Sequence, residues 1–72
     1  MARELSDYRD NLEAILDFTG GARVLTVGQV KAYCFGEEQA AHVDNRRVKR
    51  RYPFKDGVIS AATLARCMSS GA

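Results

Sequence analysis

The chain has 72 residues, of which 46% are hydrophobic and 28% charged, a composition typical of a globular protein. Its length allows one domain with a small core, about 60% of the unfolded surface being buried, so we expect no preformed catalytic pocket and no enzyme. No apolar run approaches the ~18 residues of a membrane span, and the charged opening "MARELSDYRD" is unlike a signal peptide, so we expect a cytoplasmic protein with no membrane partner.

The net charge of +2 hides an asymmetry along the chain. Residues 1–20 carry two arginines against five carboxylates, which gives −3, whereas residues 21–72 carry nine Lys/Arg against four carboxylates, which gives +5. Basic charge concentrated in this way favours binding of a polyanion.

The first predicted element is a helix from a Ser6 cap to about Phe18, ended by Gly20-Gly21. Its apolar residues fall at helical spacing, and they are Tyr8, Leu12, Ile15 and Leu16. We interpret residues 1–22 as an N-terminal helix that braces the rest of the chain. A dimer seam along this stripe is the alternative, which leaves a homodimer open.

A second helix is predicted to begin at Thr26, because Gln29 three residues later completes a capping box. It should follow a short extended segment at Val24-Leu25 and end near Phe35-Gly36, glycine being a common residue at a helix end. The next stretch, "EEQAAH", fits either an extra helical turn or a surface loop.

A basic helix is predicted over residues 45–52, with Asp44 as its N-cap and Pro53 as its stop. On a helical wheel with Val48 turned inward, Tyr52 and Asp44 fall near it, while Arg46 and Arg50 point away from the core. Repulsion between these like charges favours an external anionic partner.

The residues after Pro53 predict a tight hairpin around Asp56-Gly57, because this dipeptide supplies the positive φ angles of such a turn. Ser60 then caps a last helix over "AATLARCM", which turns Leu64, Cys67 and Met68 inward, and residues 69–72 form a frayed tail. Cys34, Cys67 and His42 are too scattered for a metal site, so we expect reduced thiols and no cofactor.

Two helices joined by a turn, the second one basic, are typical of a helix-turn-helix, and a following hairpin would be its wing. Arginine side chains release counterions from phosphates and hydrogen-bond guanine edges in the major groove. We therefore expect a mainly α fold with a small β-hairpin, a winged helix-turn-helix over residues 23–68, that binds double-stranded DNA. The expected DNA-binding residues are Asn45, Arg46, Arg47, Lys49, Arg50, Arg51 and Lys55.

The stretches "LTVGQVKAY", "VDNRRVKRRYPF" and "GVISAATLARCM" resemble the small winged helix-turn-helix domains of the excisionase and MerR-like class. "GEEQAAH" lengthens the turn, the wing is short, and the N-terminal helix lies outside the resemblance. The resemblance implies a non-catalytic protein of a mobile genetic element that bends DNA for a recombinase or integrase, or regulates transcription.

Other interpretations of the basic run remain open. It can be a solvated face or a targeting signal. The chain can also be a protein-interaction adaptor that uses its acidic first helix and its basic helix. RNA binding is less favoured, because Tyr33, Tyr52 and Phe54 are expected in the core rather than exposed for base stacking.

Overall fold

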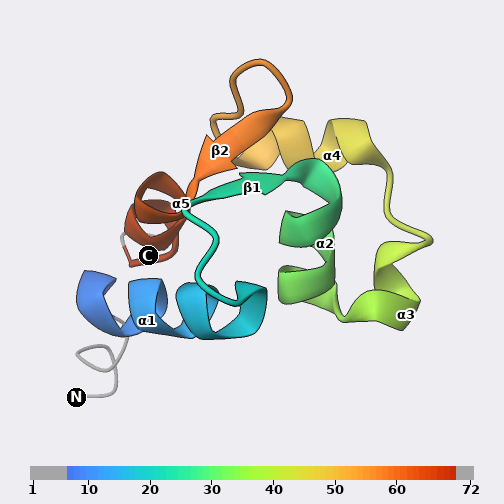
Figure 1. Ribbon diagram of the computed structural model, residues 1–72. Helices are drawn as coiled ribbons and strands as arrows, with labels where there is room; N and C mark the ends of the chain where they lie inside the picture. The colour runs from blue at the N-terminus through green and yellow to red at the C-terminus, as the bar shows by residue number, and fades with distance from the viewer. Residues whose placement is uncertain (1–6, 70–72) are drawn as a thin grey trace.

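The computed structural model describes residues 7–69 and is mainly helical, with one small antiparallel sheet in that part of the chain (Figure 1). The elements in chain order are α1 (Tyr8–Thr19), β1 (Val24–Thr26), α2 (Val27–Phe35), α3 (Glu37–Ala40), α4 (Asn45–Arg51), β2 (Val58–Ser60) and α5 (Ala61–Ser69). The coarse fold prediction, helices with a two-stranded sheet, is confirmed.

The first helix begins one residue later than the prediction. Asp7 is the N-cap of α1, and its Oδ1 accepts a hydrogen bond from the backbone N–H of Asp10 at 2.9 Å. Ser6, the predicted cap, lies outside the described residues. At the other end Gly20 adopts the left-handed conformation (φ 72°) and donates its N–H to the Leu16 carbonyl, as expected for a glycine cap.

The sheet differs from the predicted hairpin. The Asp56-Gly57 turn is present, with φ of 56° and 83°, and Lys55 and Val58 exchange backbone hydrogen bonds of 2.8 and 3.1 Å across it. Beyond that single bridge, however, β2 pairs with β1, in the antiparallel register Val24↔Ser60, Leu25↔Ile59 and Thr26↔Val58. The hairpin prediction was therefore wrong in its strand partner, because the extended residues 24–26 offer β2 a longer ladder than residues 54 and 55 do.

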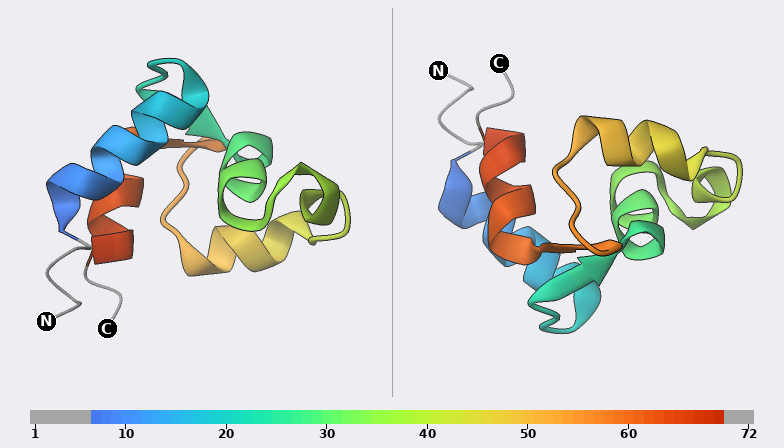
Figure 2. Two further views of the ribbon diagram at one scale, coloured as in Figure 1. Left: turned by 90° about the horizontal axis from the view of Figure 1, so that it is seen from below. Right: turned by 90° about the horizontal axis from the view of Figure 1, so that it is seen from above.

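One core joins the helices and the sheet. Its fully buried large side chains are Ile15, Leu25, Val30 and Leu64. Helix α1 packs along α5, and the two lie side by side in all three views (Figure 2). Asn11 Nδ2 also donates to Ser69 Oγ at 3.0 Å. Ser69 therefore belongs to α5 rather than to the predicted frayed tail, whose other residues, 70–72, lie outside the described part.

The connection between α2 and α4 contains a single helical turn, α3. The predicted capping box at the start of α2 is confirmed, since Thr26 Oγ1 accepts from Gln29 N at 3.2 Å and Gln29 Oε1 accepts from Thr26 N at 2.9 Å. Gly36 ends α2 and starts α3, which resolves the ambiguous "EEQAAH" segment as helix over Glu37–Ala40. Among the described helices, none is both long and apolar enough to cross a lipid bilayer.

Candidate nucleic-acid interface

Helix α4 is held to the protein by one buried side chain. Val48 is 2% exposed and is the one buried residue of this helix, so it faces inward as expected. Asp44 caps the helix, with its Oδ1 accepting from the Arg46 N–H at 2.9 Å. The helix ends at Arg51, one residue before the predicted end, because Tyr52 precedes Pro53 and is extended (φ −124°, ψ 148°).

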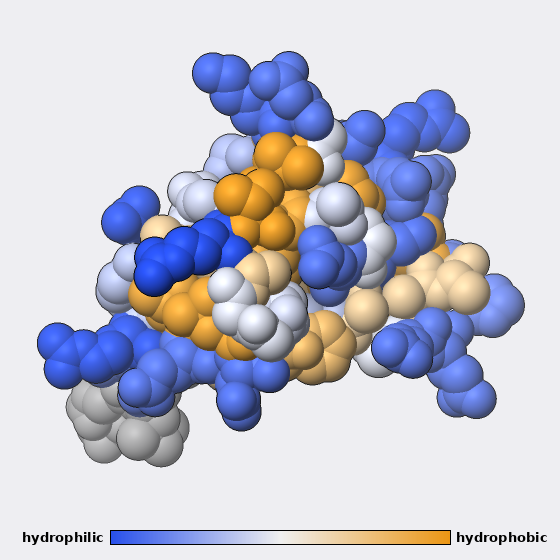
Figure 3. Space-filling view, in the orientation of Figure 1, coloured by the Kyte–Doolittle hydropathy of each residue, from blue (hydrophilic) through white to orange (hydrophobic). Residues whose placement is uncertain are grey.

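The rest of α4 faces solvent. The side chain of Arg46 is 85% exposed, and the other predicted contact residues are exposed as well. The structure brings six of the seven predicted residues together on α4, and they are Asn45, Arg46, Arg47, Lys49, Arg50 and Arg51. The seventh, Lys55, lies on the turn that follows, separated from α4 by residues 52–54. Hydrophilic side chains project at the top of Figure 3, where Figure 1 has this turn, and at the right beside α3 and α4.

The cations of α4 border two different surfaces. On one side Arg46, Lys49 and Arg50 surround a shallow hollow together with Asp44. On the other side Arg47, Arg50 and Arg51 border a groove. The remaining lining of this groove is largely apolar and aromatic, and consists of Tyr33, Cys34, Phe35, Val48, Tyr52 and Met68. Arg50 borders both surfaces, so the cations of α4 form one continuous cationic face. One side of this face adjoins the shallow hollow, and the other side adjoins the groove.

Two arginines on the groove side lie over aromatic rings. The guanidinium carbon of Arg47 is 5.8 Å from the centre of the Phe35 ring, and that of Arg51 is 5.9 Å from the centre of the Tyr52 ring. Contacts of this kind are attractive through the quadrupole of the ring. Sequence reasoning missed Phe35 in this role, since nothing local indicates that the end of α2 lies beside α4.

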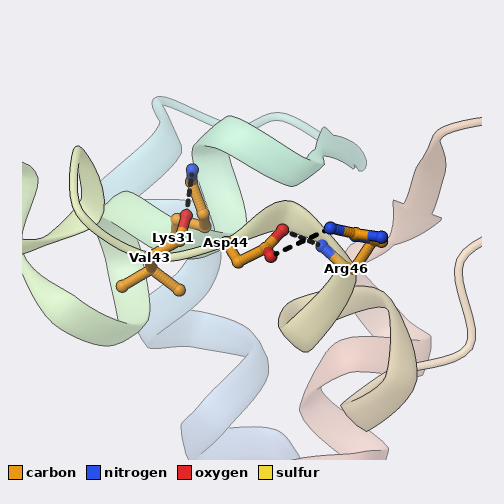
Figure 4. Close-up of polar contacts among 4 residues, drawn as sticks. All are labelled: Lys31, Val43, Asp44 and Arg46. Carbon is orange, nitrogen blue, oxygen red and sulfur yellow. Dashed lines mark hydrogen bonds and ion pairs between the residues drawn. The ribbon is translucent and has the colours of Figure 1, made fainter.

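Further polar contacts lie at the start of α4 (Figure 4). Lys31 of α2 donates from Nζ to the Val43 carbonyl at 2.9 Å, which ties α2 to the residues just before the helix. Asp44 Oδ2 lies 3.7 Å from Arg46 Nη2, a long ion pair between two exposed side chains. Because such exposed pairs are weak, Arg46 remains available to an external anion.

Two ionisable side chains in the lining of the groove, Cys34 and Tyr52, carry no charge near neutral pH. Burial raises the pKa of the Cys34 thiol, and the hydrogen bond with Tyr52 and the charge of Arg51 only partly offset this effect. Burial likewise raises the pKa of Tyr52, whose hydroxyl lies 4.0 Å from Cys34 Sγ. The thiol and the phenol therefore stay protonated, and the thiol is a poor nucleophile in this form.

Neither a cluster of metal ligands in the described residues nor a match to another protein indicates a second functional site. Within residues 7–69, no three His, Cys, Asp or Glu side chains gather in a way that would hold a metal ion. Comparison with family models, with curated proteins and with solved structures finds no match to this chain. The geometry and charge of the described residues are therefore the basis for a proposed function.

Proposed function

We propose that this chain is a sequence-specific double-stranded DNA-binding protein of the winged helix-turn-helix type, with α2 and α4 as its two helices and the turn at residues 55–58 as its wing. One observation carries the proposal: α4 buries only Val48 and exposes five cations, Arg46, Arg47, Lys49, Arg50 and Arg51. The resemblance to excisionases adds a role in a mobile genetic element, as an architectural factor or a transcription regulator.

The size of α4 suits the major groove of DNA. An α-helix with its side chains is about 10–12 Å across, and the groove is about 12 Å wide, so a helix such as α4 can enter it. Arg46 and Arg50 lie one helical turn apart on the side opposite Val48, so both extend toward a duplex that meets this face. Arginine in this position donates two hydrogen bonds to a guanine edge, which gives sequence preference beyond the attraction to phosphates.

The turn after α4 supplies a second contact. Lys55 is exposed next to Asp56-Gly57, and a short turn beside the helix suits contact with the phosphate backbone or the minor groove. A backbone contact of this kind positions the helix without selecting a sequence.

The salt dependence of binding tests the proposal. If α4 and the turn neutralise about five phosphates, affinity for a random duplex should fall about 500-fold between 50 and 200 mM salt. Fluorescence anisotropy with a labelled duplex measures this slope. Absence of any duplex binding at low salt would contradict the proposal.

Variants locate the interface. We expect Arg46→Ala or Arg50→Ala to weaken binding about 5- to 100-fold while circular dichroism shows an intact fold, because both side chains are exposed. Arg9→Ala is the matched control, since it removes the same charge from an exposed position on α1, outside the proposed interface. Equal losses in all three variants would indicate a general charge effect rather than a defined interface.

A second candidate function, an adaptor between proteins, is favoured by the surface of α1. Asp10, Glu13 and Asp17 line one shallow acidic surface there, and Phe18 is 50% exposed nearby in the sequence. Analytical ultracentrifugation separates the two functions: a stable oligomer without DNA affinity supports the adaptor.

A further inference from the structure

Asp44 is the one carboxylate in residues 44–52, and it lies within the cationic face. Its side chain is 60% exposed and shares the shallow hollow with Arg46, Lys49 and Arg50. Capping of α4 occupies Oδ1, while Oδ2 is directed toward the Arg46 guanidinium at 3.7 Å (Figure 4). Capping alone does not require a charge, since asparagine caps helices about as well as aspartate.

We infer that Asp44 is a specificity-determining residue, which limits binding of α4 to DNA phosphates and favours binding to base edges. This inference rests on the proposed function. When Arg46 contacts a phosphate of the duplex, that phosphate lies close to the Asp44 carboxylate, and the two negative charges repel each other. When Arg46 instead contacts the edge of a guanine, no formal negative charge lies beside Asp44, so the repulsion is smaller.

The carboxylate also has an attractive partner in the major groove. Oδ2 is a hydrogen-bond acceptor, and the amino group of cytosine is the donor that Asp and Glu accept from in this groove. A guanine next to Arg46 and a cytosine amino group next to Asp44 would therefore satisfy both side chains. Selectivity is the difference between the affinities for a specific and a non-specific duplex. Asp44 raises the first affinity, through the cytosine amino group, and lowers the second, through repulsion of a phosphate.

The decisive variant is Asp44→Asn, which keeps the capping acceptor and removes the charge. A duplex selected from a random pool by the wild-type protein, and a scrambled duplex of the same composition, are the two probes. We expect the variant to bind the scrambled duplex about two- to five-fold more tightly, the range that an exposed charge interaction supports. The selected duplex should gain nothing and can only lose the contact with the cytosine amino group, so the ratio of the two affinities falls by at least the same factor.

Asp56→Asn is the matched control. It removes the same charge from the exposed turn beside Lys55, and asparagine tolerates the left-handed conformation (φ 56°) of that residue. We expect it to change the affinity for both duplexes equally and to leave the ratio unchanged.

The outcomes distinguish a failure of this inference from a failure of the proposed function. No binding of either duplex by the wild-type protein overturns the proposed function and this inference together. Binding with the same ratio in the wild-type protein and in Asp44→Asn overturns the inference alone, and leaves Asp44 as a cap without a role in selectivity. Thermal melting of Asp44→Asn, expected near the wild-type value, shows that neither result comes from a loss of fold.

Discussion

Gly36 holds a backbone conformation that side chains strongly disfavour. Its φ of 87° and ψ of 150° lie in a region that is essentially restricted to glycine, and they turn the chain sharply from α2 into α3. A Cβ added at Gly36 would meet no atom within 4 Å, so the restriction comes from the backbone and not from crowding. This residue therefore sets the direction of the segment that leads to α4.

We expect Gly36→Ala to cost about 1–3 kcal/mol of folding free energy, the usual range for a residue forced into such a conformation. The melting temperature should fall by about 4–8 °C for each kcal/mol in a domain of this size. Gly28→Ala is the control, because Gly28 lies inside α2 and a Cβ there meets only Thr26 Oγ1, at 3.8 Å. That variant should be stabilised by up to about 1 kcal/mol, since alanine favours helix. A loss of stability in both variants would contradict the backbone argument.

At the scale of elements, α2 and α4 meet through partly buried polar groups. Cys34 Sγ on α2 lies 4.0 Å from the hydroxyl of Tyr52, the C-cap residue that follows α4. Both pKa values are raised, chiefly by burial. The junction between the two helices is therefore sensitive to alkaline pH.

Folding stability should be unaffected by these groups below the ordinary pKa of the thiol, about 9.0, and should decrease as the pH rises above it. The reason is that these groups lose their protons at a lower pH in the unfolded chain than in the folded protein. Ionisation therefore stabilises the unfolded state first, and the free energy of unfolding decreases. Urea denaturation between pH 7 and pH 10.5 measures the decrease. Cys34→Ala should lose less stability over this range than the wild-type protein, and identical pH profiles would exclude the thiol as a cause.

The capping contacts at the helix ends were predictable because each depends on residues close together in the sequence. Hydrogen bonds over two to four positions determine the pair Thr26 and Gln29, the cap Asp44 before α4, and the cap Gly20 after α1. The inward position of Val48 was expected because it is the one apolar residue among the charged residues 46–51. The cap of α1 was misplaced because Ser6 and Asp7 are both good capping residues, and the sequence does not distinguish adjacent candidates.

Contacts between distant segments were not predictable in this way. The pairing of β1 with β2 joins residues more than thirty positions apart, and each strand has only three residues, too few for a clear pattern. The contact of Phe35 with Arg47 depends on how α2 and α4 are placed. Of the candidate site, the sequence therefore indicated the α4 residues and Lys55, but not the aromatic neighbours or the place of Asp44 within the cationic face.

At the scale of the whole molecule, α1 and α5 contribute to the same core as β1, α2, α4 and β2. Ile15 on α1 is 0% exposed and belongs to the same cluster as Leu64 on α5 and Val48 on α4. Loss of packing between α1 and α5 therefore affects the proposed DNA-binding helix, although α1 carries none of its residues.

We expect Ile15→Ala to cost about 2–5 kcal/mol, a large part of the roughly 4–11 kcal/mol available to a chain of this length. The variant should unfold at much lower urea concentration, as measured by circular dichroism. Glu13→Ala is the control on the same helix, because its side chain is exposed and the change should stay within about 0.5 kcal/mol. Near-equal stabilities would mean that α1 adds little to the core.

The pairing of α1 with α5 also has a practical consequence for experiments on DNA. The start of α1 and the end of α5 lie close together, at the end of the molecule away from α3 and α4 (Figures 1 and 2). A fluorophore or surface tether attached through either helix end would therefore lie away from the basic helix, so the protein can be immobilised without obstructing the proposed DNA contact.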